Sequence, residues 1–527
     1  MDDWKETVRN YLKSELVKRD LTHEGLVTAL YNIGIVETKA SIDNKISRGT
    51  FSAVFLLQCL HAIDKLHTPS KYPTPSISFT INSPFPPSYQ YELFDKHYNN
   101  FYAHNRLKLL YKDITKPSAD SLGDNKVISL FSGAGGFDLG LETVGFETVA
   151  CVEIDADCRE TLRHNRPNWK LLENDNNRIA GDIRSIYPDE ILELSHLKKG
   201  EAALVIGGAP CQPFSNIGMK KGEKDPKNGD LFLEFVKMVK GIQPKAFIFE
   251  NVVGITQSRH SGVIEYMIEK LSGLGYGISY AVLNAANYGV AQKRERFFLL
   301  GISNVLKPAF PLPTHFKGLK EWSSFINHLD RTPKCVPEPW ITLNEIMNTL
   351  PSGYQSRSDY AVMNISDTVV KRMELIKPGQ NFKVLPLDMR PDCWKSGKHQ
   401  GQDTFGRLRL DEPSVTIRTA AYNPAKGKYI HPIENRGLNT IEMAAIQSFP
   451  FDWHFKTATR KRITLKSGGM QIGNAVPPLL AQALGLAIKT QLTNSFNAES
   501  DYKHPQLVST NSLQKLHQQQ LVGHYEL

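Results

Sequence analysis

The sequence lacks any long apolar segment. No run of about eighteen apolar residues, the least that spans a membrane, occurs in its 527 residues. Its first residues, Met1-Asp2-Asp3, are acidic and do not resemble a secretory signal. The six cysteines are scattered without the paired spacing of a metal site. These absences predict a cytoplasmic protein with reduced thiols, no membrane association and no bound metal.

Positive charge is present only in modest excess. The formal net charge is +9, which suits a polyanionic partner but does not require one. Hydrophobic residues make up 41% of the chain, enough for a sizeable core. The length exceeds one ordinary domain, so we expect several.

One cysteine directly follows an apolar run. Residues 203–206 predict a buried strand, and the turn after it leads through Pro210 to Cys211. Two glycines and two prolines shape this turn, so the thiol would be presented to a cleft as a nucleophile. A lone cysteine is more often a small buried hydrophobe, and the assignment therefore depends on the downstream residues.

A carboxyl group follows the next strand. The apolar run 246–249 ends in Glu250, and ligands of parallel sheets bind at the carboxyl ends of strands, so Cys211 and Glu250 are expected to converge. Arg294 and Arg296 directly precede another apolar run, where a cation is costly unless it binds a carboxylate, a phosphate or a polar ring. The alternative for these arginines is a solvated run of charge.

A glycine-rich turn follows the first predicted strand, residues 127–130. It reads Phe131-Ser-Gly-Ala-Gly-Gly-Phe-Asp138, which would let a nucleoside lie against the backbone. Asp138 takes the place of the third small residue of a dinucleotide fingerprint, which disfavours a pyrophosphate. Glu153 lies twenty positions after Gly133, the usual distance for an acid that binds a ribose diol.

These motifs and their order resemble the DNA cytosine-5 methyltransferases of bacterial restriction-modification systems. The resemblance spans residues 124 to 490 and depends on the segments Phe131–Gly136, Glu153, Asp182, Pro210–Gln212, Glu250–Val252, Gln292–Arg296, Arg436–Pro450 and Gln471–Pro478. It implies an α/β fold with a Rossmann-like, doubly wound S-adenosylmethionine-dependent methyltransferase domain and a smaller, irregular, β-rich target-recognition domain.

The resemblance also implies a covalent mechanism. Cys211 would attack carbon 6 of cytosine, Glu250 would assist at ring nitrogen 3, and carbon 5 would take a methyl group from S-adenosyl-L-methionine. Arg296 would hold the cytosine carbonyl and fix Glu250, and Arg294 would lie close to the nucleophile. The residues implied for the methyl donor are Phe131, Ser132, Gly133, Gly135, Glu153, Asp182, Pro210, Asn474 and Val476.

The target base must leave the duplex before it can react. A loop at residues 214–232 carries four lysines and is expected to close over it. The target-recognition segment, 301–435, has 18 Lys and Arg against 13 Asp and Glu. The expected DNA contacts are Gln212, Ser215, Lys220, Lys221, Lys227, Arg407, Arg409 and Arg418, with Lys395 and Lys398 as further candidates.

Three positions depart from the family pattern. Ala209 stands where a proline is common, Lys227 replaces an arginine of the loop, and Asn439 stands where threonine is frequent. A phosphate contact of the loop is expected to weaken, and Asn439 is interpreted as a structural change. None of the three removes a group that the reaction needs.

Apolar residues at helical spacing predict a bundle of four short helices at residues 1–67, with a turn at Gly34. A helix-turn-helix module that binds DNA and a neutral bundle that binds protein are equally compatible with its 9 basic and 9 acidic residues. The expected organisation is 1–67 helical, 68–120 linker and packing segment, 121–300 catalytic, 301–435 target recognition, 436–491 return to the catalytic domain and 492–527 polar tail.

The function expected from this pattern is a modification methylase. It would act as a monomer on double-stranded DNA and protect that DNA from a partner restriction endonuclease. Two alternatives remain open: the same chemistry on tRNA, against which the long recognition segment argues, and a transcriptional repressor that acts through residues 1–67.

Overall fold

A computed structural model of the chain describes residues 12–13, 16–17, 21–32, 37–48, 55, 59, 62–63, 125–173, 179–210, 231–256, 261–305, 307–318, 321, 338–395 and 403–495. The chain divides into two compact units, Met1–Pro86 and Pro87–Leu527. None of the helices in these described ranges is long and apolar enough to cross a membrane.

The first unit contains helices α2 (His23–Asn32) and α3 (Lys39–Arg48), which contact each other. Two of the four short helices predicted for residues 1–67 are thereby confirmed, whereas the turn at Gly34 lies outside the described residues. The apolar residues that set the helical spacing form one buried core: Leu12, Leu16, Leu26, Ala29, Leu30, Ile42, Ile46, Phe55, Cys59, Ala62 and Ile63.

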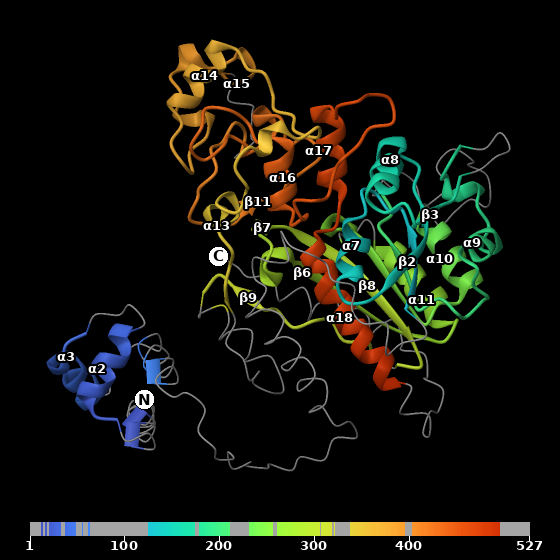
Figure 1. The fold of residues 1–527 in the computed structure, drawn as a ribbon, viewed down its shortest axis with the longest axis horizontal. Coiled ribbons are helices and arrows are strands. Elements are labelled where there is room, and N and C mark those ends of the chain that lie inside the picture. The colour runs from blue at the N-terminus through green and yellow to red at the C-terminus, as the bar shows by residue number, and fades with distance from the viewer. Residues whose placement is uncertain are drawn as a thin grey trace. The chain divides into compact units, whose positions relative to one another are not determined.

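A seven-stranded sheet organises the second unit, in the order β3-β2-β1-β4-β5-β8-β6 (Figure 1). Its strands are β1 (Lys126–Leu130), β2 (Glu147–Val152), β3 (Lys170–Leu171), β4 (Leu204–Gly207), β5 (Ala246–Val252), β6 (Tyr276–Asn284) and β8 (Glu295–Ser303). The first five strands in the sheet order are parallel, but β8 runs antiparallel to both of its neighbours.

Helices cover both faces of this sheet, so the predicted doubly wound α/β domain is confirmed. Helices α7 (Gly136–Glu142) and α18 (Pro478–Ser495) pack on one face. Helices α9 (Pro188–Ser195), α10 (Leu231–Ile242) and α11 (Ser261–Ser272) pack on the other. Burial on both faces explains why β4 is an uninterrupted apolar run rather than an alternating one.

The C-terminal helix α18 returns to the first half of the sheet. It packs closely against α7, and the approach depends on Gly140, where a Cβ atom would lie 2.2 Å from the carbonyl oxygen of Pro478. Only a residue without a side chain allows this distance. The approach brings the residues that precede α18 to the edge of the sheet where β1 ends.

In the part that the structure describes, the segment between β8 and the return is not β-rich, contrary to expectation. Its strands in the described ranges are β9 (His315–Phe316), β10 (Glu338–Pro339) and β11 (Ser414–Val415), each of two residues. Short helices α13 (Leu343–Met347), α14 (Asp367–Glu374) and α15 (Asp392–Lys395) and irregular loops make up most of the rest. Frequent proline and glycine prevent long strands here, and a small core around Phe382, Trp394 and Phe405 holds the segment together.

Candidate active site

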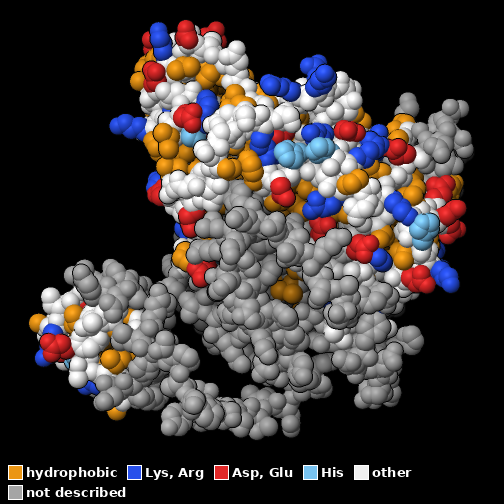
Figure 2. Space-filling model, viewed as in Figure 1, with side chains coloured by type: hydrophobic (Ala, Val, Ile, Leu, Met, Phe, Trp, Pro, Cys, Tyr) orange, Lys and Arg blue, Asp and Glu red, His pale blue; other side chains and the backbone are white. Residues whose placement is uncertain are grey.

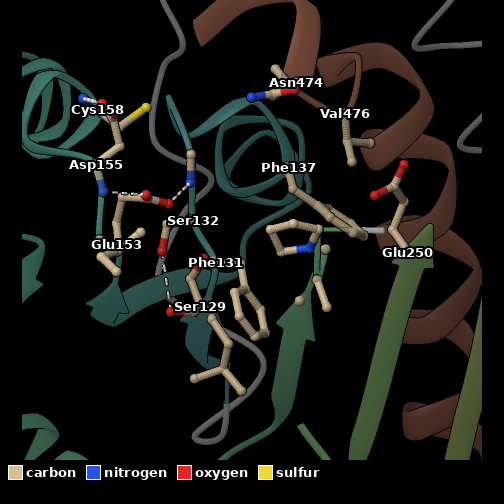
Figure 3. Close-up of a pocket in the computed structure, with 18 of the residues that line it drawn as sticks. Ser129, Phe131, Ser132, Phe137, Glu153, Asp155, Cys158, Glu250, Asn474 and Val476 are labelled. Atoms are coloured by element: carbon tan, nitrogen blue, oxygen red, sulfur yellow. Dashed lines mark hydrogen bonds between the residues drawn. The ribbon is translucent and has the colours of Figure 1, made fainter. Parts of the chain in front are cut away.

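A cavity of about 870 Å³ opens at the carboxyl ends of β1, β2, β4 and β5 (Figure 3). Most of its lining comes from four regions: the turn after β1, the ends of β2, β4 and β5, residues 181–184, and helix α17 (Leu465–Asn474) with the residues after it. Segments more than three hundred residues apart therefore form one wall, because α17 and α18 return to this edge of the sheet.

The glycine-rich turn contributes one side of the cavity. Phe131 has a φ of 54° and Gly133 a φ of 55°, so the backbone after β1 is left-handed at both positions. Phe131, Ser132 and Gly133 line the cavity. Gly135 does not belong to the lining, contrary to expectation; a Cβ atom there would meet Leu162, Trp453 and Trp169 on the opposite side. Gly135 therefore leaves the space in which these three side chains pack against the turn.

Glu153 follows β2 and lies directly beside the glycine turn, at the same end of the cavity (Figure 3). Its carboxylate accepts hydrogen bonds from the backbone N–H of Gly133 at 2.7 Å and of Asp155 at 2.7 Å. Burial raises the pKa of Glu153 although these N–H donors oppose the shift. Each carboxylate oxygen keeps a further lone pair, so Glu153 can also accept from the hydroxyl groups of a ribose.

Asp182 also lines the cavity, but it already has a partner. Arg184 donates to both of its oxygens, with Nη2 at 2.6 Å from Oδ2, and this pairing lowers the pKa of Asp182. The side chain also accepts from the backbone N–H of Arg184 and begins a short 3-10 helix, Ile183–Ser185. The guanidinium fixes the carboxylate at the rim and keeps it ionised.

Asp138 is fully buried below the glycine turn. The hydroxyl groups of Ser129 and Thr148 donate to its two oxygens, each at 3.0 Å. Burial raises the pKa of Asp138 to about 6. The carboxyl group therefore links β1, β2 and the first turn of α7, and it occupies the position that the dinucleotide fingerprint leaves to a small residue.

Glu250 and Arg296 form the opposite end of the cavity. Arg296 Nε lies 3.1 Å from Glu250 Oε1. The pair forms because β8 runs antiparallel to β5. This direction places Arg296 opposite Val252, which is two residues after Glu250 on the same strand, so the two charged side chains lie close together. Burial raises the pKa of Glu250, although Arg296 and Arg294 oppose the shift. A buried carboxyl with a raised pKa, held by a guanidinium, can donate or accept a proton at a bound ring.

Asn251 connects this pair to the turn after β4, a role that the sequence did not reveal. Its amide Nδ2 donates to the carbonyl oxygen of Ala209 at 3.0 Å. At Gly208 a Cβ atom would lie 2.9 Å from Glu250 Oε2. Glycine at 208 and asparagine at 251 therefore hold the turn that enters Pro210, which itself lines the cavity.

Residues 211–230 lie outside the described residues. The expected nucleophile Cys211 and the expected DNA contacts Gln212, Ser215, Lys220, Lys221 and Lys227 are among them. Their roles stay predictions. The same holds for Lys398.

Arg294 does not line the cavity. Its expected place close to the nucleophile stays a prediction, because Cys211 lies outside the described residues. The side chain is fully buried and donates to the carbonyl oxygens of Ile417, Gly473 and Ala475, each at 2.9 Å. It therefore ties the start of β8 to the end of the recognition segment and to the end of α17. In the described residues its side chain contacts backbone carbonyls rather than the cavity.

Asn474 and Val476, expected at the methyl-donor end, line the cavity beside α17 (Figure 3). The same segment adds Ser467, Met470 and Gln471 to the lining, and α8 (Ala156–Asn165) adds Asp157 and Cys158. None of these five was expected. The contribution of Ser467, Met470 and Gln471 depends on the return of α17 to the sheet, which no local pattern of the sequence encodes.

The arginines of the recognition segment differ in exposure. Arg407 is only 4% exposed and donates to the carbonyl oxygens of Met373, Ile376, His431 and Glu434 and to the side chain of Asn435. The expectation that Arg407 contacts DNA is therefore wrong: its donors are occupied inside the protein. Arg409 is exposed and pairs with Asp411, and Arg418 is exposed.

Comparison with known proteins agrees with this geometry. The family model described as C-5 cytosine-specific DNA methylase matches residues 125–490. A second model, described as a domain of unknown function (DUF6471), matches residues 4–66.

Three curated relatives are similar over the same part of the chain. The Type II methyltransferase M.Sau96I of Staphylococcus aureus is 34% identical over 71% of this chain and 77% of its own length. M1.HphI of Haemophilus parahaemolyticus is 34% identical over 70% of this chain and 87% of its own length. M.PspPI of a Psychrobacter species is 32% identical over 69% of this chain and 78% of its own length.

Proposed function

Because the chain belongs to the C-5 cytosine-specific DNA methylase family, we propose that it methylates carbon 5 of a flipped cytosine in one short duplex DNA sequence. The methyl donor is S-adenosyl-L-methionine. The observation that carries the proposal is a single cavity with the glycine turn and Glu153 at one end and the Glu250–Arg296 pair at the other.

The residues around the cavity fit the methyl donor. A volume of about 870 Å³ lies within the range of about 300–1,000 Å³ for small-molecule sites. Phe131 offers a ring to the adenine, Glu153 accepts from the ribose hydroxyls, and Asn474 lies where the amino-acid end would be held. When bound, S-adenosyl-L-methionine supplies an electrophilic methyl group and leaves as S-adenosyl-L-homocysteine.

The chain's own residues activate the base. The thiolate of Cys211 forms a bond to carbon 6, and the electron pair of the carbon 5–carbon 6 double bond becomes available at carbon 5. Glu250 donates a proton or hydrogen bond to ring nitrogen 3, and burial, which raises its pKa, favours the protonated form that can donate. Arg296 holds Glu250. After methylation, loss of the carbon-5 proton expels the thiolate and restores the aromatic ring.

Bisulfite sequencing of plasmid DNA from cells that express the protein tests this function. We expect protected cytosines at one recurrent short sequence, and none with the Cys211→Ser variant. The Cys393→Ser variant is a matched control, because Cys393 is an exposed cysteine away from the cavity. Plasmid with no recurrent protected cytosine would contradict the proposal.

The biological role proposed is that of a monomeric, cytoplasmic modification methylase paired with a restriction endonuclease. The relatives named above are Type II methyltransferases, which supports this role. Residues 301–435 are proposed to recognise the target sequence, between the catalytic segments 121–300 and 436–491. Plasmid methylated by the protein should resist cleavage by an endonuclease of the same specificity.

Residues 1–67 are proposed to form a separate helical module, either a DNA-binding regulator or a protein-binding appendage. The compact core of α2 and α3 supports a module that folds by itself, and the match to a domain of unknown function leaves its partner open. A fragment of residues 1–67 that shifts the promoter of its own gene would support the regulator. No shift would favour the appendage.

A further inference from the structure

A basic surface lies beside the cavity, on a segment that carries no acidic residue. From Trp453 to Ala498 the chain has six lysines and arginines but no aspartate or glutamate. Arg460, Lys461 and Arg462 are consecutive in the loop before α17, and all three are exposed. Within the described ranges none of them makes an ion pair. We call residues 457–466 the basic loop; Figure 2 shows blue side chains gathered at this end of α17.

The basic loop is anchored at both of its ends. Asp157, in the first turn of α8, accepts hydrogen bonds from Thr457 Oγ1 at 2.8 Å, from the backbone N–H of Ala458 at 2.8 Å and from Ser467 Oγ at 2.5 Å. Just before the loop, the backbone N–H of Lys456 donates to Thr161 Oγ1 at 2.8 Å. The three consecutive cations therefore project from a loop whose ends are fixed, unlike a freely solvated run of charge.

The anchor of the loop is also a wall of the cavity. Asp157 and Ser467 both line it, together with Met470 and Gln471 of α17. A base that enters the cavity remains attached to its strand, so the flanking phosphates must pass close to the cavity walls. Phosphates that pass along this wall would lie next to the basic loop.

Resting on the proposed function, we propose that Arg460, Lys461 and Arg462 bind phosphates of the DNA duplex next to the target base. The contact is to the backbone and carries no sequence information. Guanidinium groups suit it because they pair with phosphate oxygens through two parallel hydrogen bonds. The loop thus holds the DNA against the protein independently of the recognition segment 301–435.

The test measures how the affinity for a fluorescent duplex depends on NaCl concentration. The variant Arg460→Ala/Lys461→Ala/Arg462→Ala should lower the slope of log affinity against log salt by about 2 to 3, because each phosphate contact contributes about 0.9. Lys461→Ala alone should lower it by about 0.9. The matched control is Lys198→Ala/Lys199→Ala/Lys240→Ala, which removes three exposed lysines at the amino edge of the sheet and should leave the slope unchanged.

The result separates this inference from the proposed function. If the wild-type protein methylates cytosine but the triple variant keeps the wild-type salt slope, the basic loop does not bind phosphate and the proposed function stands. A loss of affinity confined to one DNA sequence would also overturn the inference, because it would indicate base contacts. If the wild-type protein transfers no methyl group, the proposed function itself fails. Unchanged thermal melting of the variants shows that folding is not the cause.

Discussion

The edge of the sheet and the recognition segment differ in what their buried polar side chains do. At the sheet edge, Glu153 follows β2 and Glu250 lies near the end of β5. The backbone groups of both strands already pair with neighbouring strands, and both side chains line a cavity. In the recognition segment, Arg407 turns inward and donates to four backbone carbonyls. Buried backbone groups must be paired. Where long strands pair the buried backbone groups with one another, polar side chains remain available to bind ligands. Where strands are short, buried side chains such as that of Arg407 form hydrogen bonds to the backbone groups instead.

The strongest expected effect lies at the sheet edge. Glu250→Gln should reduce the rate of methyl transfer by about 10²- to 10⁴-fold, because the amide cannot exchange a proton with the ring. Thermal melting should change little, since the amide keeps the shape of the carboxyl. Transfer of tritiated methyl groups to DNA measures the rate. Glu295→Gln, an exposed neighbour of Arg296, is the control and should remain active; equal loss in both variants would contradict a role specific to Glu250.

The complementary change is in the recognition segment. Arg407→Met should lower the free energy of unfolding by about 3 to 5 kcal/mol, because several buried carbonyls lose their donor at once. Chemical denaturation measures this loss. Arg409→Met, at an exposed position two residues away, should change stability by no more than about 0.5 kcal/mol. If the Arg407 variant were as stable as the Arg409 variant, buried side chains of the recognition segment would not be needed to pair its backbone, and the proposed difference from the sheet edge would be wrong.

We expect the stability of the protein to depend on pH through Asp138, which is buried below the glycine turn. Burial raises its pKa from 3.8 to about 6, so the folded protein binds this proton more tightly than the unfolded chain. The stability linked to the group is therefore complete below about pH 4 and is lost as pH rises through about 6, a change of about 3 kcal/mol.

The variant Asp138→Asn lacks this titration. Its free energy of unfolding, compared with that of the wild-type protein at each pH between 4 and 7, isolates the contribution. The wild-type protein should lose stability relative to the variant as pH rises through this window. A difference that stays constant would show that Asp138 keeps an ordinary pKa.

The smallest effect concerns Asn439, which begins helix α16 (Thr440–Ile446). Its side chain accepts from the backbone N–H of Glu442 at 2.9 Å and forms a capping box with that residue. Asn439→Ala should cost about 1 kcal/mol of stability, whereas Asn439→Thr keeps a capping oxygen and should cost less. Equal loss in both, measured by thermal melting, would show that the cap is unimportant.

The sequence predicted those parts of the site that are local. Strand ends at Glu153 and Glu250, and the glycine turn that precedes both of them along the chain, can be located from apolar runs and spacing. The Glu250–Arg296 pair needed the antiparallel direction of β8, which an apolar run does not encode. Arg407 was misplaced on the DNA surface because its partners Met373 and His431 lie more than twenty residues away on either side. Helices α2 and α3 followed from the spacing of apolar residues, whereas irregular segments have no regular spacing from which they could be predicted.

We propose that the thiol of Cys211 and the carboxyl group of Glu250 act on the same cytosine. Trapping tests it most directly: duplex DNA with 5-fluorocytosine at the target position is incubated with the protein and S-adenosyl-L-methionine and then run on a denaturing gel. Because fluorine cannot leave as a proton does, the wild-type protein should form a covalent complex, and Cys211→Ser should form none. A complex of equal yield with Cys211→Ser, or methylation of ordinary cytosine by that variant at the wild-type rate, would contradict the account.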